Sequence, residues 1–282
     1  MNYALQAENL SKNYPTFSLK NVNIELPKGY IMGFIGPNGA GKSTTISALL
    51  GLLSPDSGKC FIDGTEVSQL TKEEKSKIGV VLDDCCFPEI LTYPQVNKFM
   101  SKIYANWDSE KFMNGCEKFG LSKKQQISKY SKGMKMKLSI MSAMCHDAKL
   151  LVMDEATSGL DPIVREEILD MLLEFVQNEE NSVFISSHII SDLEKVCDYI
   201  TFIKDGSIVF TAEKDMLKED YGILRCSNAD FENIDKASVI SYHQNSFATD
   251  ALVHRNKIKG DYIIDKANIE DIMLYYVKGD KK

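Results

Sequence analysis

The chain has 282 residues, of which 44% are hydrophobic and 26% charged, and its formal net charge is −7. That composition argues against wholesale disorder, and the length suits one large subdivided domain or two domains. The acidic balance disfavours a free-standing nucleic-acid binder, although it leaves room for a local basic patch. Seven cysteines without a CxxC pair favour reduced thiols over a disulfide framework or a zinc site.

Two absences in the sequence bear on location. No run of about 18 apolar residues occurs, so the chain is not expected to cross a bilayer by itself. Residues 1–8 carry neither a basic leader nor an apolar segment, so no signal peptide is expected there.

The first part of the chain is predicted to form short strands separated by glycine and proline. Strands are expected over 3–7, 17–26 and 30–35. The third strand leads into a glycine-rich turn at 36–41, and a helix follows over about 42–50.

The next part changes from strand to helical character. Asp63-Gly64 suits the type I′ turn of a hairpin, and residues 78–82 are a buried strand candidate. From about 84 to 147, Met, Lys, Phe and Leu recur at helical spacing and β-branched runs are scarce. This pattern predicts a helical insertion within an α/β domain.

The second half returns to alternating strands and helices. Residues 149–154 predict a buried strand that ends in carboxylates, and 182–186 predict another. Asp161-Pro162 is a strong helix start, with Asp as the N-cap and Pro at the first helical position, and the helix is expected to reach about Gln177. Its buried face is expected to comprise Ile168, Leu172, Leu173 and Val176.

The last part has a weaker pattern. Asp205-Gly206 predicts a second hairpin, and residues 269–277 predict a terminal helix. Runs such as Tyr262-Ile263-Ile264 alternate only briefly. We therefore expect a main domain over 1–212 and a small appended α/β unit over 213–282.

A phosphate-binding loop stands between the third strand and the following helix. Its pattern, GxxxxGK[ST], is specific in that context, because glycines let backbone N–H groups face phosphates and the helix N-terminus adds its dipole. Lys42 is expected to reach the β- and γ-phosphates and the Ser43 hydroxyl to ligate Mg²⁺. A merely structural glycine turn is the weaker alternative. The loop consists of Gly36, Pro37, Asn38, Gly39, Ala40, Gly41, Lys42, Ser43 and Thr44.

A second motif supplies two acids. The apolar strand before Asp154 delivers Asp154 and Glu155 to its carboxyl end, where open α/β sheets bind ligands. Asp154 is expected to hold the Mg²⁺ shell, and Glu155 to accept a proton from the attacking water. Adjacent acids at a strand end are weak evidence alone, but they are strong evidence beside a phosphate loop.

Together these motifs make the chain resemble the ATPase subunit of an ATP-binding-cassette (ABC) transporter over about residues 3–212. The resemblance implies an α/β fold: a P-loop NTPase core, RecA-like, with an antiparallel β subdomain, an inserted α-helical subdomain and a small C-terminal α/β extension. It extends to residues 158–161, Ser-Gly-Leu-Asp, which are similar to the family's D-loop.

Further residues take their roles from the same resemblance. His188 matches the switch histidine that senses the γ-phosphate, and Tyr14 matches the aromatic residue that stacks on adenine. Ser131 and Gly133 lie in Tyr-Ser-Lys-Gly-Met, where the family has the Leu-Ser-Gly-Gly-Gln signature. A hydroxyl and a small residue at a helix N-terminus suit an anion. The plainer alternatives are a packed tyrosine, a structural histidine and a solvated helix face for the neighbouring lysines.

The chain departs from the family at two places. Lys132 and Met134 replace a glycine and the glutamine of the signature, and the glutamine of the family's Q-loop falls on Asp83. A carboxylate at Asp83 can meet Mg²⁺ or the attacking water, but it is shorter than glutamine and adds charge. We expect altered turnover rather than an inactive site, because the loop lysine, both strand-end acids and the histidine are present.

The resemblance also implies partners. Two ATP molecules with Mg²⁺ are expected between two chains, the phosphate loop of one facing the signature of the other. A homodimer suffices because one chain carries every catalytic element, while a heterodimer with a related subunit stays open. A separate integral-membrane permease is expected to contact the helical insertion and the 83–91 loop. The expected location is the cytoplasmic face of a bacterial cell membrane.

Within the family, Asn106-Trp107-Asp108, the altered signature and the C-terminal extension resemble a branch of bacterial exporters. Its members export antimicrobial or amphipathic peptides, as in bacitracin, lantibiotic and phenol-soluble-modulin systems. The alternatives are an exporter of another small molecule or a lipid, a soluble ABC ATPase acting on the ribosome or nucleic acid, and another P-loop enzyme such as a GTPase. A single cassette and the acidic charge disfavour a nucleic-acid partner, and no NKxD guanine motif occurs.

Overall fold

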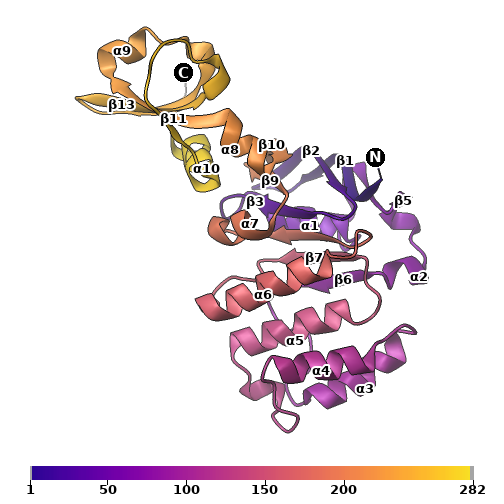
Figure 1. Ribbon diagram of the computed structural model, residues 1–282. Coiled ribbons are helices and arrows are strands. Elements are labelled where there is room, and N and C mark those ends of the chain that lie inside the picture. Colours follow the sequence, from indigo (N-terminus) through magenta and orange to yellow (C-terminus); the bar gives the residue numbers. More distant parts are fainter. Residues whose placement is uncertain (1, 280–282) are drawn as a thin grey trace.

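The computed structural model describes residues 2–279, and a six-stranded sheet forms the centre of the described chain (Figure 1). Its order is β10-β9-β3-β8-β7-β6, with parallel neighbours except for the antiparallel β9-β10 hairpin at one edge. The strands are β3 (Ile31–Ile35), β6 (Ile78–Val81), β7 (Leu150–Asp154), β8 (Ser182–Ser186), β9 (Tyr199–Lys204) and β10 (Ser207–Glu213).

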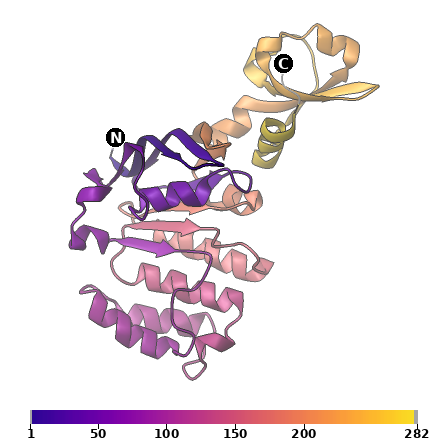
Figure 2. The same ribbon diagram turned by 180° about the vertical axis from the view of Figure 1, so that it is seen from behind.

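An antiparallel sheet of order β2-β1-β4-β5 lies beside this core (Figure 2). The predicted hairpin at Asp63-Gly64 is confirmed, because both residues have positive φ angles of 50° and 80°, as a type I′ turn requires. The strands are β1 (Tyr3–Asn13), β2 (Ser18–Pro27), β4 (Ser57–Ile62) and β5 (Thr65–Glu66).

The helical insertion is confirmed at the lower end of Figure 1. It follows β6 and returns to the sheet at β7, and the Asn106-Trp107-Asp108 segment connects its first two helices. The helices are α3 (Tyr93–Ile103), α4 (Ser109–Lys118), η2 (Ile127–Lys129) and α5 (Lys132–Met144); η1 (Val67–Gln69) and α2 (Lys72–Lys75) precede β6.

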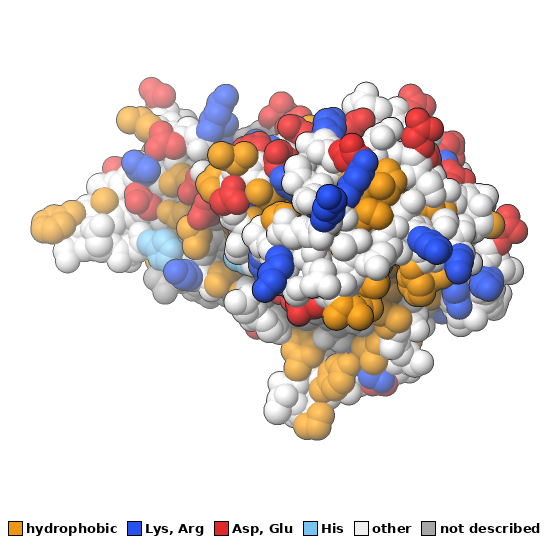
Figure 3. Space-filling view, turned by 90° about the horizontal axis from the view of Figure 1, so that it is seen from below, with side chains coloured by type: hydrophobic (Ala, Val, Ile, Leu, Met, Phe, Trp, Pro, Cys, Tyr) orange, Lys and Arg blue, Asp and Glu red, His pale blue; other side chains and the backbone are white. Residues whose placement is uncertain are grey.

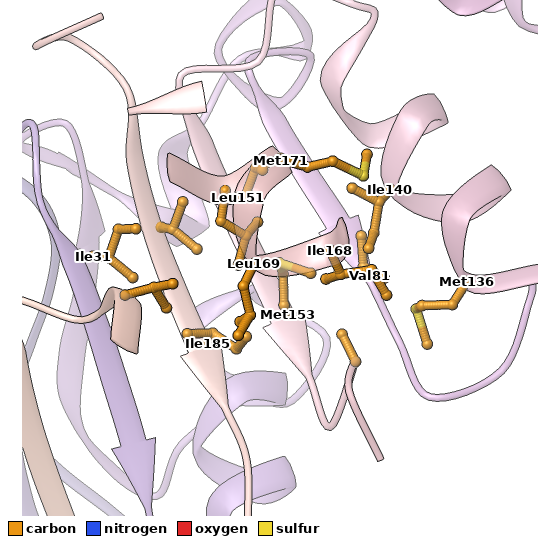
Figure 4. Packing of buried hydrophobic residues seen from close by; sticks show 14 of the residues in the cluster. Ile31, Val81, Met136, Ile140, Leu151, Met153, Ile168, Leu169, Met171 and Ile185 are labelled. Atoms are coloured by element: carbon orange, nitrogen blue, oxygen red, sulfur yellow. The ribbon is translucent and has the colours of Figure 1, made fainter. Parts of the chain in front are cut away.

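Both faces of the central sheet are covered, which explains why its strands read as continuous apolar runs. Ile31, Leu151 and Ile185 face α5, α6 (Pro162–Phe175) and α7 (Ile190–Val196), as Figure 4 shows for α5 and α6. Their alternating neighbours, such as Met32 and Val152, pack instead with α1 (Lys42–Leu49) and the antiparallel sheet.

Helix α6 begins as predicted. The Asp161 carboxylate accepts hydrogen bonds from the backbone N–H groups of Ile163 and Val164, both at 3.1 Å, and Pro162 occupies the first turn. The expected buried face is wrong at Leu173, which is 39% exposed. The helix turns about 100° per residue, so Leu173 lies beyond the edge of the face centred on Ile168 and Leu172.

The C-terminal part forms a four-stranded antiparallel sheet of order β12-β13-β11-β14, which α8 connects to β10. The predicted terminal helix is confirmed as α10, whereas Tyr262 and Ile263 precede a strand rather than form one. The elements are α8 (Lys214–Asp220), β11 (Tyr221–Ser227), α9 (Asn228–Glu232), η3 (Lys236–Ser238), β12 (Val239–Gln244), β13 (Ala248–His254), η4 (Arg255–Lys257), β14 (Ile264–Lys266) and α10 (Ile269–Lys278).

The C-terminal part shares apolar contacts with the main core. Leu217, Tyr221 and Ile272 belong to the same buried cluster as the residues of the central sheet and α7. The Glu194 carboxylate of α7 accepts the backbone N–H of Ile269 at 3.0 Å and lies 3.3 Å from the Lys218 ammonium. Between residues 2 and 279, no helix has the length and apolar character needed to traverse a membrane.

Candidate functional site

The phosphate loop is shaped by glycines that other residues cannot replace. Gly41 precedes α1 with a φ of 110°, and a Cβ there would lie 2.6 Å from Leu19 Cδ2. A Cβ on Gly36 would lie 2.4 Å from the carbonyl oxygen of Ile203. The Lys42 side chain is 6% exposed, and its Nζ donates to the Gly36 carbonyl at 2.9 Å.

A cleft of about 530 Å³ opens beside this loop. It brings together predicted site residues from four separate parts of the sequence, namely the phosphate loop, Asp83, Glu155 and His188. Its lining consists of Phe17, Asn38, Gly39, Gly41, Lys42, Ser43, Thr44, Asp83, Glu155, Ser158 and His188.

Glu155 lies at the centre of the polar contacts in the cleft. One carboxylate oxygen is 3.3 Å from Lys42 Nζ, and the other is 2.6 Å from His188 Nδ1. Its backbone has a φ of 53°, a left-handed conformation that is strained for a residue with a side chain. Its N–H donates to the Ser186 carbonyl and hydroxyl oxygens at 3.1 and 3.0 Å, which helps to hold that conformation.

The oxygen groups near the loop fit a magnesium ion that arrives with a nucleotide. Ser43 and Asp83 line the cleft, and the Asp154 carboxylate at the end of β7 accepts the Ser186 hydroxyl. Mg²⁺ prefers oxygen ligands and is commonly held by one or two carboxylates together with substrate phosphates. Within residues 2–279, no group of three or more His, Cys, Asp or Glu side chains is placed to hold a metal.

The aromatic side chain beside the loop is Phe17. Tyr14 lies in the connection between β1 and β2, is 41% exposed and does not line the cleft. Phe17 lines it, and its Cζ lies 2.7 Å from the position that a Cβ on Gly41 would take. Sequence reasoning missed Phe17, because its contact with Gly41, which Leu19 shares, appears only in the folded chain.

Ser131 and Gly133 lie outside the cleft of their own chain. Ser131 is the N-cap of α5, and its hydroxyl accepts the Met134 N–H at 3.2 Å. Gly133 is buried, and a Cβ there would lie 3.0 Å from Val164 Cγ1 of α6. Local capping and packing therefore account for both residue types within one chain.

The remaining loop residues form the scaffold of the cleft rather than its lining. The Pro37 carbonyl accepts the Ala40 N–H at 3.1 Å, and Ala40 is only 3% exposed.

Ser158, between Glu155 and α6, lines the cleft and was not singled out as a contact from sequence. Its position in the Ser-Gly-Leu-Asp segment was the available signal.

Comparisons with known proteins identify relatives of this chain. The family model described as ABC transporter matches residues 19–158. The linearmycin resistance ATP-binding protein LnrL of Bacillus subtilis (strain 168) is 33% identical, covering 91% of this chain and 84% of its own length. The lantibiotic transport ATP-binding protein SrtF of Streptococcus pyogenes is 36% identical, covering 75% and 91%. The bacitracin transport ATP-binding protein BcrA of Enterococcus faecalis is 34% identical, covering 74% and 69%.

The solved structures show the same fold. The cbiO1 protein from Clostridium perfringens, described as part of the ABC transporter complex cbiONQ, superposes with a TM-score of 0.65 at 25% identity. The match covers 78% of this chain and 92% of that one. Fold and site thus define a P-loop NTPase with the ABC cassette architecture. The chain belongs to the ABC transporter family, as an ATP-binding subunit whose ATPase activity is coupled to transport.

Proposed function

We propose that this ATPase drives the export of antimicrobial or amphipathic peptides or toxins through a separate membrane permease. The observation that carries the proposal is the similarity to two relatives at 34–36% identity, whose names specify bacitracin transport and lantibiotic transport. The match to LnrL includes most of the C-terminal part, because it covers 91% of the chain.

The proposed chemistry follows from the contacts of Glu155. Its carboxylate accepts the proton of the attacking water, and His188 orients that carboxylate. Lys42 leaves Glu155 for the β- and γ-phosphates, which frees the base when substrate is bound. Mg²⁺ bound with ATP supplies charge neutralisation at the phosphates, and Ser43, Asp154 and Asp83 are its proposed ligands.

The binding of adenine is proposed to involve an aromatic face. Phe17 is our structural candidate because it lines the cleft, whereas Tyr14 is the candidate by family resemblance. His188 is also proposed to sense the γ-phosphate, and its half-exposed side chain leaves it accessible to a ligand in the cleft.

The assembly is proposed to be a homodimer around two ATP molecules, with Ser131 and Gly133 of each chain facing the nucleotide of the other. A heterodimer with a related subunit is the alternative. In this proposal residues 1–212 act as the ATPase domain and 213–282 as an extension for dimerisation or regulation. The dimer works at the cytoplasmic face of a bacterial cell membrane, and no nucleic acid takes part.

The proposed permease contact is a groove of about 480 Å³ between β6, α3 and α5. Val80, Leu82, Phe99 and Ile103 line it and are 41–54% exposed, and apolar side chains grouped in this way on a surface mark interaction sites. Figure 3 looks onto the molecule from the end with the helical insertion, where hydrophobic side chains are exposed among lysines. The groove also includes part of the 83–91 loop.

The test begins with Glu155→Gln, whose amide keeps the size of the side chain but cannot accept the proton. We expect ATP hydrolysis to fall about 10²–10⁴-fold while ATP is retained. Phosphate release and bound nucleotide measure the two effects, and Lys42→Ala is the control that should lose nucleotide affinity. Hydrolysis at the parent rate would remove Glu155 from its proposed role.

The partner is then identified by recovering Glu155→Gln from detergent-solubilised membranes with ATP and Mg²⁺. One polytopic membrane protein in near-equal amount supports the exporter. Recovery only with ribosomal or DNA-bound partners would contradict it. Peptide cargo is tested by deleting the gene and measuring resistance to bacitracin-type and lantibiotic peptides, with the Glu155→Gln gene as the inactive control. Unchanged resistance would favour another small molecule or a lipid.

A further inference from the structure

The segment 83–91 links the nucleotide cleft to α5. It begins at Asp83, whose carboxylate lines the cleft and lies 2.7 Å from Lys132 Nζ. Farther along, Glu89 pairs with Lys135 at 2.7 Å. Both lysines are in the first turn of α5, and residues three apart share a helix face. Two ion pairs therefore connect this segment to one face of one helix.

The two ion pairs have different surroundings. Near Glu89 the backbone also holds the segment, because the Ile127 and Ser128 N–H groups donate to the Leu91 and Glu89 carbonyls, both at 2.9 Å. Lys132 instead extends toward the D-loop, with Nζ 3.6 Å from the position of a Cβ on Gly159. The Asp83–Lys132 pair thus joins the cleft, the D-loop and the N-terminus of α5.

The Asp83–Lys132 pair is easily opened. The Lys132 and Asp83 side chains are 44% and 57% exposed, and exposed pairs contribute little to stability. Asp83 shares the cleft with Lys42 and Ser43, where a Mg²⁺ ion bound with a nucleotide would bring a positive charge that competes with Lys132. That Mg²⁺ ion can therefore compete with Lys132 for Asp83, whereas the phosphates, which are negative like Asp83, cannot.

We propose that the Asp83–Lys132 ion pair is a latch that nucleotide binding opens. Asp83 leaves Lys132 when Mg²⁺ and ATP fill the cleft, and the N-terminus of α5 with Ser131 is released from the core of its own chain. The proposal rests on the proposed binding of Mg²⁺ and ATP in this cleft, and it makes Lys132 a positioning residue. Thermodynamic reciprocity requires that a pair broken by the nucleotide also weakens nucleotide binding.

The test is a double-mutant cycle in the full-length Glu155→Gln protein, with Kd measured by calorimetry at concentrations where sedimentation shows a monomer. We expect Lys132→Gln to tighten binding of ATP with Mg²⁺ about two- to fivefold, because no pair has to be broken. The same change is expected to have no effect with ATP and EDTA. In an Asp83→Asn background, Lys132→Gln is expected to leave the Kd unchanged.

Lys135→Gln is the matched control. It removes the same charge from the same helical turn, but its partner Glu89 does not line the cleft, so Kd should not change. The latch is contradicted if Lys132→Gln leaves Kd unchanged, or if its effect on Kd persists in the Asp83→Asn background. Failure of the parent to bind ATP at all would instead contradict the proposed function, on which the latch depends.

Discussion

At the scale of single residues, Phe17 is the clearest addition to the site. Replacing it with alanine removes an aromatic face from the cleft, and base–aromatic stacking contributes about 1–3 kcal/mol. We expect Phe17→Ala to weaken ATP affinity by at least about fivefold and Tyr14→Ala to change it less. Calorimetric titration with ATP compares them. A larger effect at Tyr14 would return the adenine contact to the residue that matches the family.

His146 predicts how stability depends on pH. Its ring is 3% exposed, its Nδ1 lies 2.8 Å from the Ser76 carbonyl oxygen, and it stacks on Tyr104. Burial lowers the pKa of His146 below its ordinary value of about 6.5. Below that ordinary value the unfolded chain therefore binds more protons than the folded one, so the free energy of unfolding falls as the pH drops.

The measurement is urea unfolding at pH 7.5 and pH 5.5 for the parent protein and His146→Gln. The parent should lose more stability between the two pH values than the variant, which lacks this titrating group. Equal losses would mean that His146 is as easily protonated in the folded chain as in the unfolded one.

At the scale of elements, the start of α6 can be tested alone. Asp161 accepts two backbone N–H groups, so Asp161→Ala leaves them without this partner and is expected to cost about 0.5–2 kcal/mol of unfolding free energy. Asp161→Asn keeps a capping oxygen and is the control. Chemical denaturation measures both, and a loss as large in Asp161→Asn would point to charge rather than capping.

The same elements show which features of the fold and the site could be predicted from the sequence. The phosphate loop and the start of α6 were predictable because their signals are local, in glycine spacing and in Asp161-Pro162. The place of Phe17 depends on β2 lying against the loop before α1, and the Asp83–Lys132 pair joins residues far apart in the chain. Neither has a local signal.

The strand pairing of the C-terminal sheet could not be predicted from sequence for a related reason. Its pairing, such as Tyr221 with His254, connects segments separated by α9 and β12, and each strand alternates only briefly. Ile263 is apolar, yet it is 76% exposed in the loop before β14, so apolar character alone does not locate the strand. Amphipathic α10 was predictable because its periodicity is complete within its own residues.

At the scale of the whole molecule, α7 connects the cleft with the C-terminal part. His188 stands just before α7, and Glu194 near its end holds the first turn of α10 and Lys218 of α8. We expect Glu194→Ala to speed hydrogen exchange at Ile269 and its neighbours by loosening α10, while ATP affinity stays unchanged. Glu166→Ala is the control, since it removes a different ion pair of α7, the one between Glu166 of α6 and Lys195 of α7. Unchanged exchange would mean that apolar packing alone holds α10.

The backbone conformation of Glu155 determines which substitution at this position would stabilise the fold. A left-handed conformation at a residue with a side chain costs about 1–3 kcal/mol, and glycine would adopt it without that cost. Replacing the proposed base with glycine would therefore remove this backbone cost. A laboratory screen for heat resistance alone would favour glycine at this position, and the survivors would lack the carboxylate that is proposed to accept the proton of the attacking water.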